Sequence, residues 1–238
     1  MILHLLAAGA SKGLVSDLQA RFAAETGAEL AASFMAAGAV RERFQAGDPC
    51  DVVILTAALL DQLSAHGLLD GAPAPIGMVR TGIAVPAGKP VPNVETSVGL
   101  RKALLAARGI YVPDPQISTA GVHFMRVVRE LGIQPQVMPY LRPFPNGATA
   151  MHNLAKATEP DAIGCTQITE IKYTPGLTVA GPLPEALGLA TVYAAAVAGR
   201  SVQPDAARRL VTLLTGPESL ELRQAGGFEV PSGEPFGT

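Results

Sequence analysis

Short runs of consecutive hydrophobic residues alternate along this chain with segments whose apolar positions recur at helical spacing. In the first third, the continuous runs predict strands at 2–8, 29–34 and 52–56. The segments between and after them predict helices at 14–26, 39–46 and 58–66. A run as uniformly apolar as 52–56 is typical of a strand that is buried on both faces. This order of elements predicts a parallel sheet wrapped by helices.

The middle of the chain repeats the alternation after Gly71–Pro75, a segment of glycine, alanine and proline that we interpret as a linker. Strands are predicted at 81–86, 109–112 and 162–166, and helices at 98–107, 120–131 and 148–157. Segment 136–144 is predicted to be extended. The rest of the chain returns through extended segments at 177–180 and 191–197 to helices at 205–214 and 217–224.

The two sets of elements predict an α/β protein of two lobes, each a mostly parallel sheet flanked by helices. Lobe 1 is expected to contain residues 1–80 and 187–238, and lobe 2 residues 81–186, so that the chain crosses twice between them. In such sheets ligands bind beyond the carboxyl ends of the strands. We therefore expect a ligand cleft between the lobes.

Composition narrows the function further. The chain has 238 residues, of which 48% are hydrophobic and 16% charged, so it is long and apolar enough to fold around real cores. The net charge is −2, no basic tract is present and tryptophan is absent, which argues against a nucleic-acid partner. No apolar run is long enough for a membrane span, so no membrane insertion is expected.

The apolar start of the chain bears on its location. Met1–Ala8 lacks the basic residues that open a signal peptide, and it continues into the first predicted strand. We interpret it as structural, which places the chain as it stands in the cytoplasm. If a signal peptide has been removed, the periplasm is the alternative.

The cysteines and histidines show no metal-binding spacing. Cys50 and Cys165 lie in or beside predicted strands and are expected to be small buried residues. His4, His66 and His152 are not spaced as ligands of one ion. We therefore expect no metal and no cofactor.

Three polar segments carry the chemical signal of the sequence. Segments 7–13, 114–124 and 144–151 are rich in Gly, Ser, Thr or Asn, and each lies between a strand-like run and a helix-like run. The first backbone N–H groups of a helix have no partner within the helix, and they attract anions. The sequence therefore predicts that the chain binds a small negatively charged molecule.

The order and spacing of several further runs are similar to a known family. Leu5–Ser11 and Cys50–Leu55, with an ending through Leu213–Glu218 and Ala225–Phe228, resemble the molybdate-binding-like solute-binding proteins. The resemblance covers nearly the whole chain. It implies a two-lobed type II periplasmic-binding-protein fold, and the family also includes aconitate isomerase.

The resemblance argues against molybdate itself. Where molybdate binders have a hydroxyl in the first loop, this chain has Ala10, followed by Ser11. The second loop includes Ala37 and Gly38 and offers no hydroxyl, and Gln167 stands where the family has a tyrosine. Each missing charge-assisted hydrogen bond is worth about 1.5–3 kcal/mol. The resemblance thus implies an oxyanion site adapted to a small organic carboxylate.

Lys12, Ser118 and Thr119 are candidate ligand contacts at two strand–helix junctions. Lys12 is either a clamp for a carboxylate or an ordinary surface lysine. Ser118 and Thr119 precede a predicted helix, so each is either an anion contact or an N-cap.

The other polar candidates have similar alternatives. Asn146 and Gly147 form either a ligand-binding corner or a simple turn. Thr166 and Gln167 end an apolar strand and need partners, which are either a ligand or neighbouring loops. His123 is either a packed residue or, if it faces the cleft, the best general acid or base in the chain.

Two classes of function follow, with a weaker third. The first is a binding protein for a small organic anion, whose partner is an ABC transporter permease if the chain is exported. The second is a cofactor-independent isomerase of a small tricarboxylate, which transfers a proton next to a carboxylate through Lys12 and His123. A cytoplasmic sensor ranks last, because no effector domain is visible.

Overall fold

The computed structural model describes residues 1–231 and divides into two compact α/β units. Unit 1 contains Met1–Val79 and the chain from Thr191 onward, and unit 2 contains Arg80–Ala190. Two strands, β4 (Leu69–Pro86) and β9 (Ala190–Ala198), lead the chain from unit 1 into unit 2 and back. Residues 232–238, with which the predicted lobe 1 ends, lie outside the described part of the chain.

Unit 1 contains three strand–helix pairs. The strands are β1 (Ile2–Ala8), β2 (Glu29–Met35) and β3 (Val52–Thr56), followed respectively by α1 (Lys12–Thr26), α2 (Ala37–Gln45) and α3 (Ala57–Ala65). β1 pairs in parallel with β2 and β3, and β9 pairs antiparallel with β3, which gives the strand order β2-β1-β3-β9. Helices α9 (Pro204–Thr215) and α10 (Leu220–Gly226) complete the unit, with short 3₁₀ turns at Gly9–Ser11 and Pro217–Ser219.

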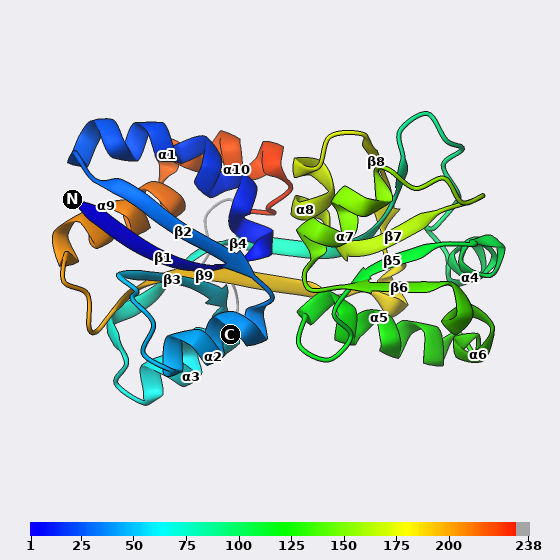
Figure 1. Cartoon of the computed structure of the whole chain (residues 1–238), viewed down its shortest axis with the longest axis horizontal. Helices are drawn as coiled ribbons and strands as arrows, with labels where there is room; N and C mark the ends of the chain where they lie inside the picture. The colour runs from blue at the N-terminus through cyan, green and yellow to red at the C-terminus, as the bar shows by residue number, and fades with distance from the viewer. Residues whose placement is uncertain (232–238) are drawn as a thin grey trace. The chain divides into compact units, whose positions relative to one another are not determined.

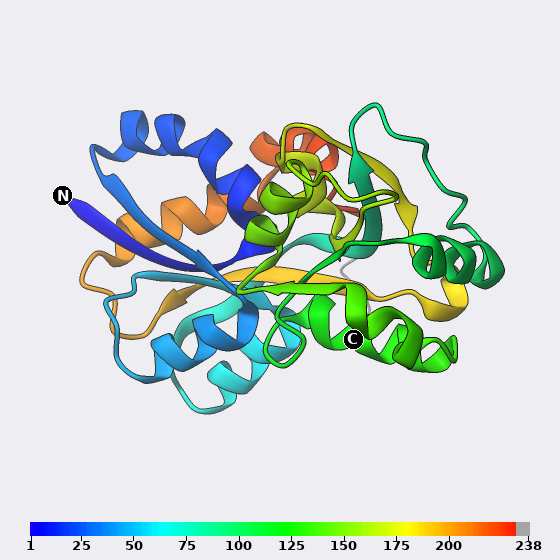
Figure 2. The same ribbon diagram turned by 45° about the vertical axis from the view of Figure 1, so that its right-hand side comes forward.

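The strands of unit 1 are stabilised by helices that pack on both faces of its sheet. α1, α9 and α10 cover one face of the sheet, and α2 and α3 cover the other (Figures 1 and 2). Val52–Leu55 of β3 are completely buried, and Leu18 and Phe22 of α1 pack into the same core. Burying a side chain of this size stabilises the fold by about 1.5–3 kcal/mol. Because β1, β2 and β3 are parallel neighbours, their carboxyl ends meet at one edge.

Unit 2 repeats this construction with an antiparallel addition. Its strands are β5 (Ile110–Pro113), β6 (Leu141–Phe144), β7 (Ile163–Gln167) and β8 (Leu177–Pro182), together with the second part of β4. Its helices are α4 (Ser97–Ala106), α5 (Thr119–Glu130), α6 (Gln134–Val137), α7 (Gly147–Leu154) and α8 (Ile168–Tyr173), with 3₁₀ turns at Met138–Tyr140 and Glu185–Leu187. β5 is parallel to β6 and β7, and β4 is antiparallel to β7 and β8.

Two apolar clusters hold the helices of unit 2 on its sheet. Leu104 of α4 and Phe124 of α5 belong to one cluster, and Met151 of α7 and Ile171 of α8 belong to the other. Figure 1 shows α5 on one side of the strands and α7 and α8 on the other. As in unit 1, the parallel strands β7, β5 and β6 are neighbours and end at the same edge.

The structure corrects two predicted elements. Gly71–Pro75 is not a linker but the exposed first part of β4. Proline fixes its φ angle near the extended region and is tolerated in strands where no ladder hydrogen bond is needed, which explains the misleading composition. Segment 136–144 is not continuously extended, because Pro135 lies in the first turn of α6 and Pro139 lies in the next turn, before β6 starts at Leu141.

Helix α8 was missed by the sequence analysis. It begins directly after β7 and is only six residues long. A segment this short does not show a helical repeat of apolar positions. None of the helices formed by residues 1–231 is long and apolar enough to cross a membrane.

Candidate functional site

The predicted residues of unit 1 lie at the carboxyl ends of two adjacent strands. Ala10 and Ser11 form the 3₁₀ turn after β1, and Lys12 is the first residue of α1. Ala37 and Gly38 are the first two residues of α2, directly after β2. Since Ala8 of β1 is paired with Met35 of β2, the structure brings these five residues to one edge of the sheet.

The Ser11 hydroxyl is committed within its own turn. It is completely buried and donates a hydrogen bond to the carbonyl oxygen of Ala8 at 2.8 Å. A serine hydroxyl has one proton to donate, so this group does not also donate to an anion in this conformation. The start of α1 has no side-chain cap either, so its backbone N–H groups are the other polar groups of this loop.

The predicted residues of unit 2 also gather at one edge of a sheet. Ser118 and Thr119 begin α5 after β5, Asn146 and Gly147 begin α7 after β6, and Thr166 and Gln167 end β7. Because these three strands are neighbours, the residues share the carboxyl edge of the unit 2 sheet.

Ser118 is placed as an N-cap but does not act as one through its side chain. It is buried, and its hydroxyl makes no capping hydrogen bond to α5. The loop before it is organised instead by Asp114, whose carboxylate accepts hydrogen bonds from the backbone N–H groups of Gln116 and Ile117. The start of α5 is thus ordered without using the Ser118 hydroxyl.

Asn146 does act as an N-cap. Its side-chain oxygen accepts hydrogen bonds from the backbone N–H of Thr149 at 2.8 Å and from the Thr149 hydroxyl at 3.0 Å. The turn-and-cap alternative therefore accounts for the oxygen of this side chain.

His123 lies one turn inside α5 and is half-buried. Its Nε2 atom is 2.8 Å from the carbonyl oxygen of Leu187, in the turn at Glu185–Leu187. This hydrogen bond makes Nε2 the protonated nitrogen and joins two segments of unit 2. Any acid–base chemistry by His123 would have to use Nδ1.

The carboxyl group of Glu170, which the sequence analysis did not select, lies at this edge beside Thr166 and Gly147. Glu170 is in α8 and is buried, and the Thr166 hydroxyl donates a hydrogen bond of 2.5 Å to its Oε2. Backbone N–H groups of Ala148 and Gln167 also donate to the carboxyl group. Burial raises the pKa of Glu170 to about 7, although these hydrogen bonds act in the opposite direction.

A side chain would not fit at Gly147, because the Glu170 carboxyl group occupies the space. A Cβ atom at this position would lie 1.9 Å from Oε2 of Glu170 and 2.3 Å from the Thr166 hydroxyl. Both distances are far below van der Waals contact. The close approach shows that the loop before α7 packs directly on the end of β7.

Two buried hydroxyls at this edge have no hydrogen-bond partner among the described residues. They belong to Thr81, which is paired with Gln167 across β4 and β7, and to Thr169 of α8. Buried polar groups are nearly always satisfied. The hydroxyls are therefore suited to a polar ligand. The position of Thr81 depends on strand pairing, so sequence patterns did not indicate it.

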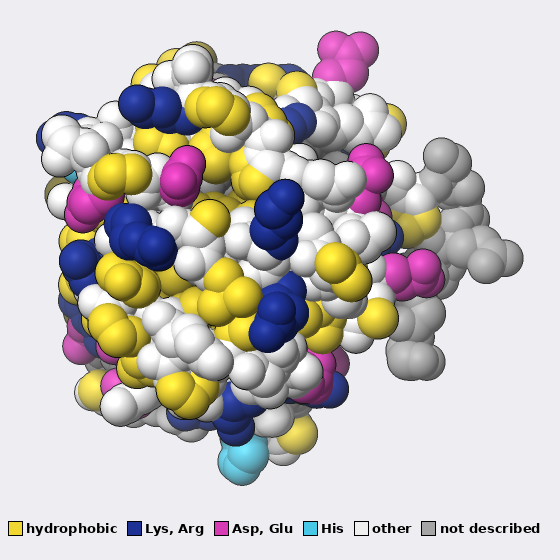
Figure 3. All heavy atoms as spheres, turned by 90° about the vertical axis from the view of Figure 1, so that its right-hand side faces the viewer, with side chains coloured by type: hydrophobic (Ala, Val, Ile, Leu, Met, Phe, Trp, Pro, Cys, Tyr) yellow, Lys and Arg dark blue, Asp and Glu magenta, His cyan; other side chains and the backbone are white. Residues whose placement is uncertain are grey.

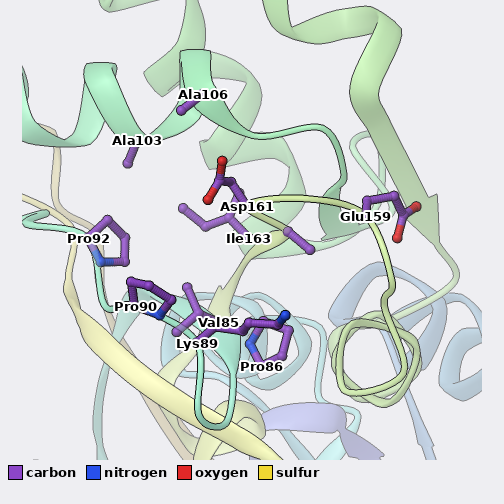
Figure 4. Close-up of a pocket in the computed structure, with 11 residues that line it drawn as sticks. Val85, Pro86, Lys89, Pro90, Pro92, Ala103, Ala106, Glu159, Asp161 and Ile163 are labelled. Carbon is purple, nitrogen blue, oxygen red and sulfur yellow. The ribbon is translucent and has the colours of Figure 1, made fainter.

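A pocket of about 110 Å³ lies at the opposite end of the unit 2 sheet. Figure 4 shows its lining, which comes from the end of β4, the proline-rich loop that follows, α4 and the residues before β7. Ile163 marks its position at the start of β7. None of the predicted site residues lines this pocket, so it is separate from the candidate site.

The face shown in Figure 3 has no cluster of charged side chains of one sign. On the end of the molecule that faces the viewer in Figure 3, Lys and Arg side chains lie singly among hydrophobic and polar ones. Residues 1–231 contain no group of three or more His, Cys, Asp or Glu side chains that could hold a metal ion. Both cysteines are buried and free, as predicted.

Comparison with known proteins gives the same fold. The family model of the bacterial extracellular solute-binding proteins matches residues 3–229. The periplasmic molybdate-binding protein of Azotobacter vinelandii superposes with a TM-score of 0.80 at 19% identity, over 97% of this chain and 100% of that one. The sulfate-binding protein SubI of Mycobacterium tuberculosis H37Rv gives a TM-score of 0.74 at 16% identity, over 96% and 86% of the two chains. These likenesses confirm the predicted two-lobed periplasmic-binding-protein fold.

An enzyme is also similar in sequence. The aconitate isomerase of a Pseudomonas species is 25% identical over 243 residues, which cover 98% of this chain and 89% of the isomerase. The predicted similarity to molybdate-binding-like proteins is thus confirmed, and it includes both binding proteins and an enzyme.

Proposed function

Because the chain belongs to the bacterial extracellular solute-binding proteins, we propose that it binds a small organic carboxylate. One observation carries this proposal. Helices α1, α2 and α5 begin at the carboxyl ends of parallel strands with no side-chain cap and no acidic residue in the first turn. Their N–H groups and the positive ends of their dipoles are suited to an anion.

Helices α3, α4 and α7 are capped by side chains, in contrast to these three. Thr56 caps α3 by accepting from the N–H of Leu59, and Thr96 caps α4 by accepting from Gly99. Asn146 and Glu170 serve α7 in the same way. α6, α9 and α10 also lack a side-chain cap, but α6 is only four residues long, and α9 and α10 have an acidic residue in the first turn. Among the helices of eight or more residues in the described part of the chain, α1, α2 and α5 are the ones whose starts have neither a cap nor an acidic side chain, so their N–H groups are open to another acceptor.

The residues around α1 and α2 favour an organic carboxylate over molybdate. The Ser11 hydroxyl donates to Ala8, and Ala36–Gly38 supply no hydroxyl, so a tetrahedral oxyanion receives no side-chain hydroxyl bond from these two loops. Buried Ala10 and Ala37 instead offer apolar contact to carbon atoms. The hydroxyls of Ser118 and Thr81 in unit 2 are suited to carboxylate oxygens.

The test is a thermal-shift screen of aconitate, citrate, fumarate, sulfate and molybdate, followed by native mass spectrometry of the freshly purified protein. A ligand that binds only the folded state raises the melting temperature with its concentration. We expect the organic carboxylates to give the larger shifts. If molybdate and sulfate stabilise the protein and no carboxylate does, the proposed ligand class is wrong.

A second candidate is an isomerase of a small tricarboxylate, favoured by the similarity to aconitate isomerase over nearly the whole chain. The reaction removes a proton from a carbon next to a carboxylate and returns one to the other end of the allylic system. His123, through Nδ1, is proposed as the acid–base group, and Lys12 and the helix ends as stabilisers of the developing negative charge.

Proton NMR of cis-aconitate incubated with the protein tests the isomerase. The proposal predicts formation of the trans isomer, slowed about 100-fold or more in both Lys12→Ala and His123→Ala. Lys89→Ala, at the pocket on the far end of unit 2, is the matched control and is expected to be active. A wild-type protein that binds aconitate without converting it is a binding protein only.

The partner depends on which function applies. For a binding protein exported to the periplasm, we propose the permease of an ABC transporter as the partner. For an enzyme in the cytoplasm, no such partner is needed. Cell fractionation separates these alternatives.

A further inference from the structure

The Glu170 carboxyl group joins the starts of two helices. As the third residue of α8, it accepts from the backbone N–H of Gln167, the residue before that helix, which is one half of a capping box. It also accepts from the N–H of Ala148, the second residue of α7. Together with the Thr166 hydroxyl, these bonds hold the loop at Asn146–Gly147 against the end of β7.

All of these partners are uncharged. The titratable or charged side chains on the surrounding elements are His152 on α7, Lys156 just after it, Lys172 and Tyr173 on α8, Cys165 on β7, Tyr111 on β5, Arg142 on β6 and Arg80 on β4. The groups that act on the Glu170 carboxyl group are instead the neutral Thr166 hydroxyl and the backbone N–H groups of Ala148 and Gln167. His152 and Lys156 contact each other at an exposed position, and Tyr111 is hydrogen-bonded to Glu159. The negative charge of an ionised Glu170 is therefore not neutralised by a cation.

Such a group binds protons in the neutral range. Desolvation disfavours the ionised form and raises the pKa of Glu170 to about 7. Near neutral pH, the protein is consequently a mixture of molecules in which Glu170 is protonated and molecules in which it is ionised.

We propose that Glu170 is a proton-binding site coupled to the anion site, so that binding of a carboxylate is accompanied by uptake of one proton at Glu170. The inference rests on the proposed function. Thr166, Gln167 and Gly147 are candidate ligand contacts, and each is a hydrogen-bond partner or packing neighbour of Glu170. A bound anion beside them repels an ionised Glu170 across a region from which water is excluded. The proton comes from the solvent and neutralises the carboxyl oxygen.

The coupling makes Glu170 a determinant of ligand charge. By linkage, an anion that raises the proton affinity of Glu170 binds more weakly as the pH rises and Glu170 ionises. A ligand with more negative charge near β7 experiences a larger effect.

Isothermal titration calorimetry with aconitate measures the coupling. At pH 7, titrations in phosphate and in Tris, whose heats of ionisation differ, give the number of protons taken up. Wild-type protein is expected to take up as much as about half a proton per ligand more than Glu170→Gln. Between pH 6 and pH 8, the wild-type dissociation constant should rise about tenfold relative to that of the variant. Aconitate's own ionisation contributes equally to both proteins and cancels.

Glu130→Gln is the matched control. Glu130 is an exposed glutamate of unit 2, paired with Arg126 at the end of α5, far along the helix from Ser118. This variant should keep the proton uptake and the pH dependence of the wild type. Equal proton uptake by the wild type and Glu170→Gln would overturn the inference and leave anion binding intact.

If no anion of the screen binds, the proposed function fails instead, so the two failures are distinguishable. If aconitate does not bind but another anion of the screen does, the most stabilising anion replaces aconitate as the probe. Should Glu170→Gln not fold, carbon-13 NMR of wild-type protein labelled at the glutamate carboxyl replaces it. One glutamate carboxyl group should then titrate near neutrality, and its titration midpoint should move to higher pH when the probe is added. If no glutamate shows this movement, the inference is contradicted.

Discussion

At the scale of the residue, burial of Glu170 makes the stability of the fold depend on pH. The folded-state pKa is about 7, whereas the ordinary value in an unfolded chain is 4.5. The folded state therefore holds the proton more tightly. Its stabilising contribution is complete below pH 4.5 and is lost as the pH rises through 7.

This linkage predicts a loss of roughly 3 kcal/mol in unfolding free energy between pH 4.5 and pH 8 from Glu170 alone. Urea unfolding at several pH values measures it. Glu170→Gln, which does not titrate, should show a correspondingly flatter profile, and Glu130→Gln should follow the wild type. Parallel profiles for the wild type and Glu170→Gln would show that Glu170 titrates normally.

The two cysteines give a second prediction at this scale. Burial raises the pKa of Cys50 to about 12 and also raises that of Cys165. Only a thiolate reacts readily with iodoacetamide. At pH 8 we expect mass spectrometry to find almost no alkylation of the native protein and complete alkylation in urea. Rapid alkylation without denaturant would mean that these thiols are accessible.

Some residues of the site were evident in the sequence, and others could not be. Ser118, Asn146 and Gln167 were selected because polar residues follow a strand and precede a helix, which is a local pattern. Glu170 was not selected, because an acidic residue is expected to be exposed when only the sequence is known. The fold shows that Gly147 and Thr166 pack against it. Burial of a polar residue depends on tertiary packing, so the spacing of residues in the sequence does not predict it.

At the scale of the element, a substitution at the start of α5 can test ligand binding independently of helix capping. The Ser118 hydroxyl makes no capping bond, so Ser118→Ala should change unfolding free energy by less than about 0.5 kcal/mol but weaken carboxylate binding about tenfold. Thr96→Ala, which removes the cap of α4, should do the reverse, with a loss of about 1 kcal/mol in stability and unchanged affinity. Equal effects of both variants on affinity would argue against a ligand at Ser118.

The packing of α5 on β5 gives another prediction. A Cβ at Gly121 would lie 2.2 Å from the carbonyl oxygen of Asp114 and 2.5 Å from that of Pro113, both backbone atoms that cannot rotate away. Gly121→Ala should therefore reduce stability by about 2–3 kcal/mol in urea unfolding.

Gly226→Ala is the control for that substitution. Gly226 ends α10, and a Cβ there meets no atom within 4 Å. This variant should be neutral or slightly more stable, because alanine is the better helix former. A neutral Gly121→Ala would mean that α5 is not packed as closely as described.

Elements with a clear pattern of apolar residues were predictable from the sequence. Elements that form only through pairing with other strands, or that are very short, were not. The limits of β1 and β3 follow directly from their continuous apolar runs. The first part of β4 has the composition of a linker and becomes a strand only through its place in the fold. α8 is too short for a periodic signal, and its start is stabilised by Glu170.

At the scale of the whole molecule, the fold could be inferred from the chain, but the ligand could not. The order of strands and helices and the runs at both ends identified the solute-binding family. Proteins with this fold include binders of molybdate, of sulfate and of thiamin, so the fold by itself does not select among them. Selection depends on the few side chains at the strand ends.

The central claim is that those strand ends bind an organic carboxylate in preference to molybdate. Calorimetric titration of the purified protein with aconitate and with molybdate, at the same pH and ionic strength, tests it most directly. The account predicts saturable binding of aconitate with a dissociation constant at least tenfold below that of molybdate. Tighter binding of molybdate than of aconitate would contradict it.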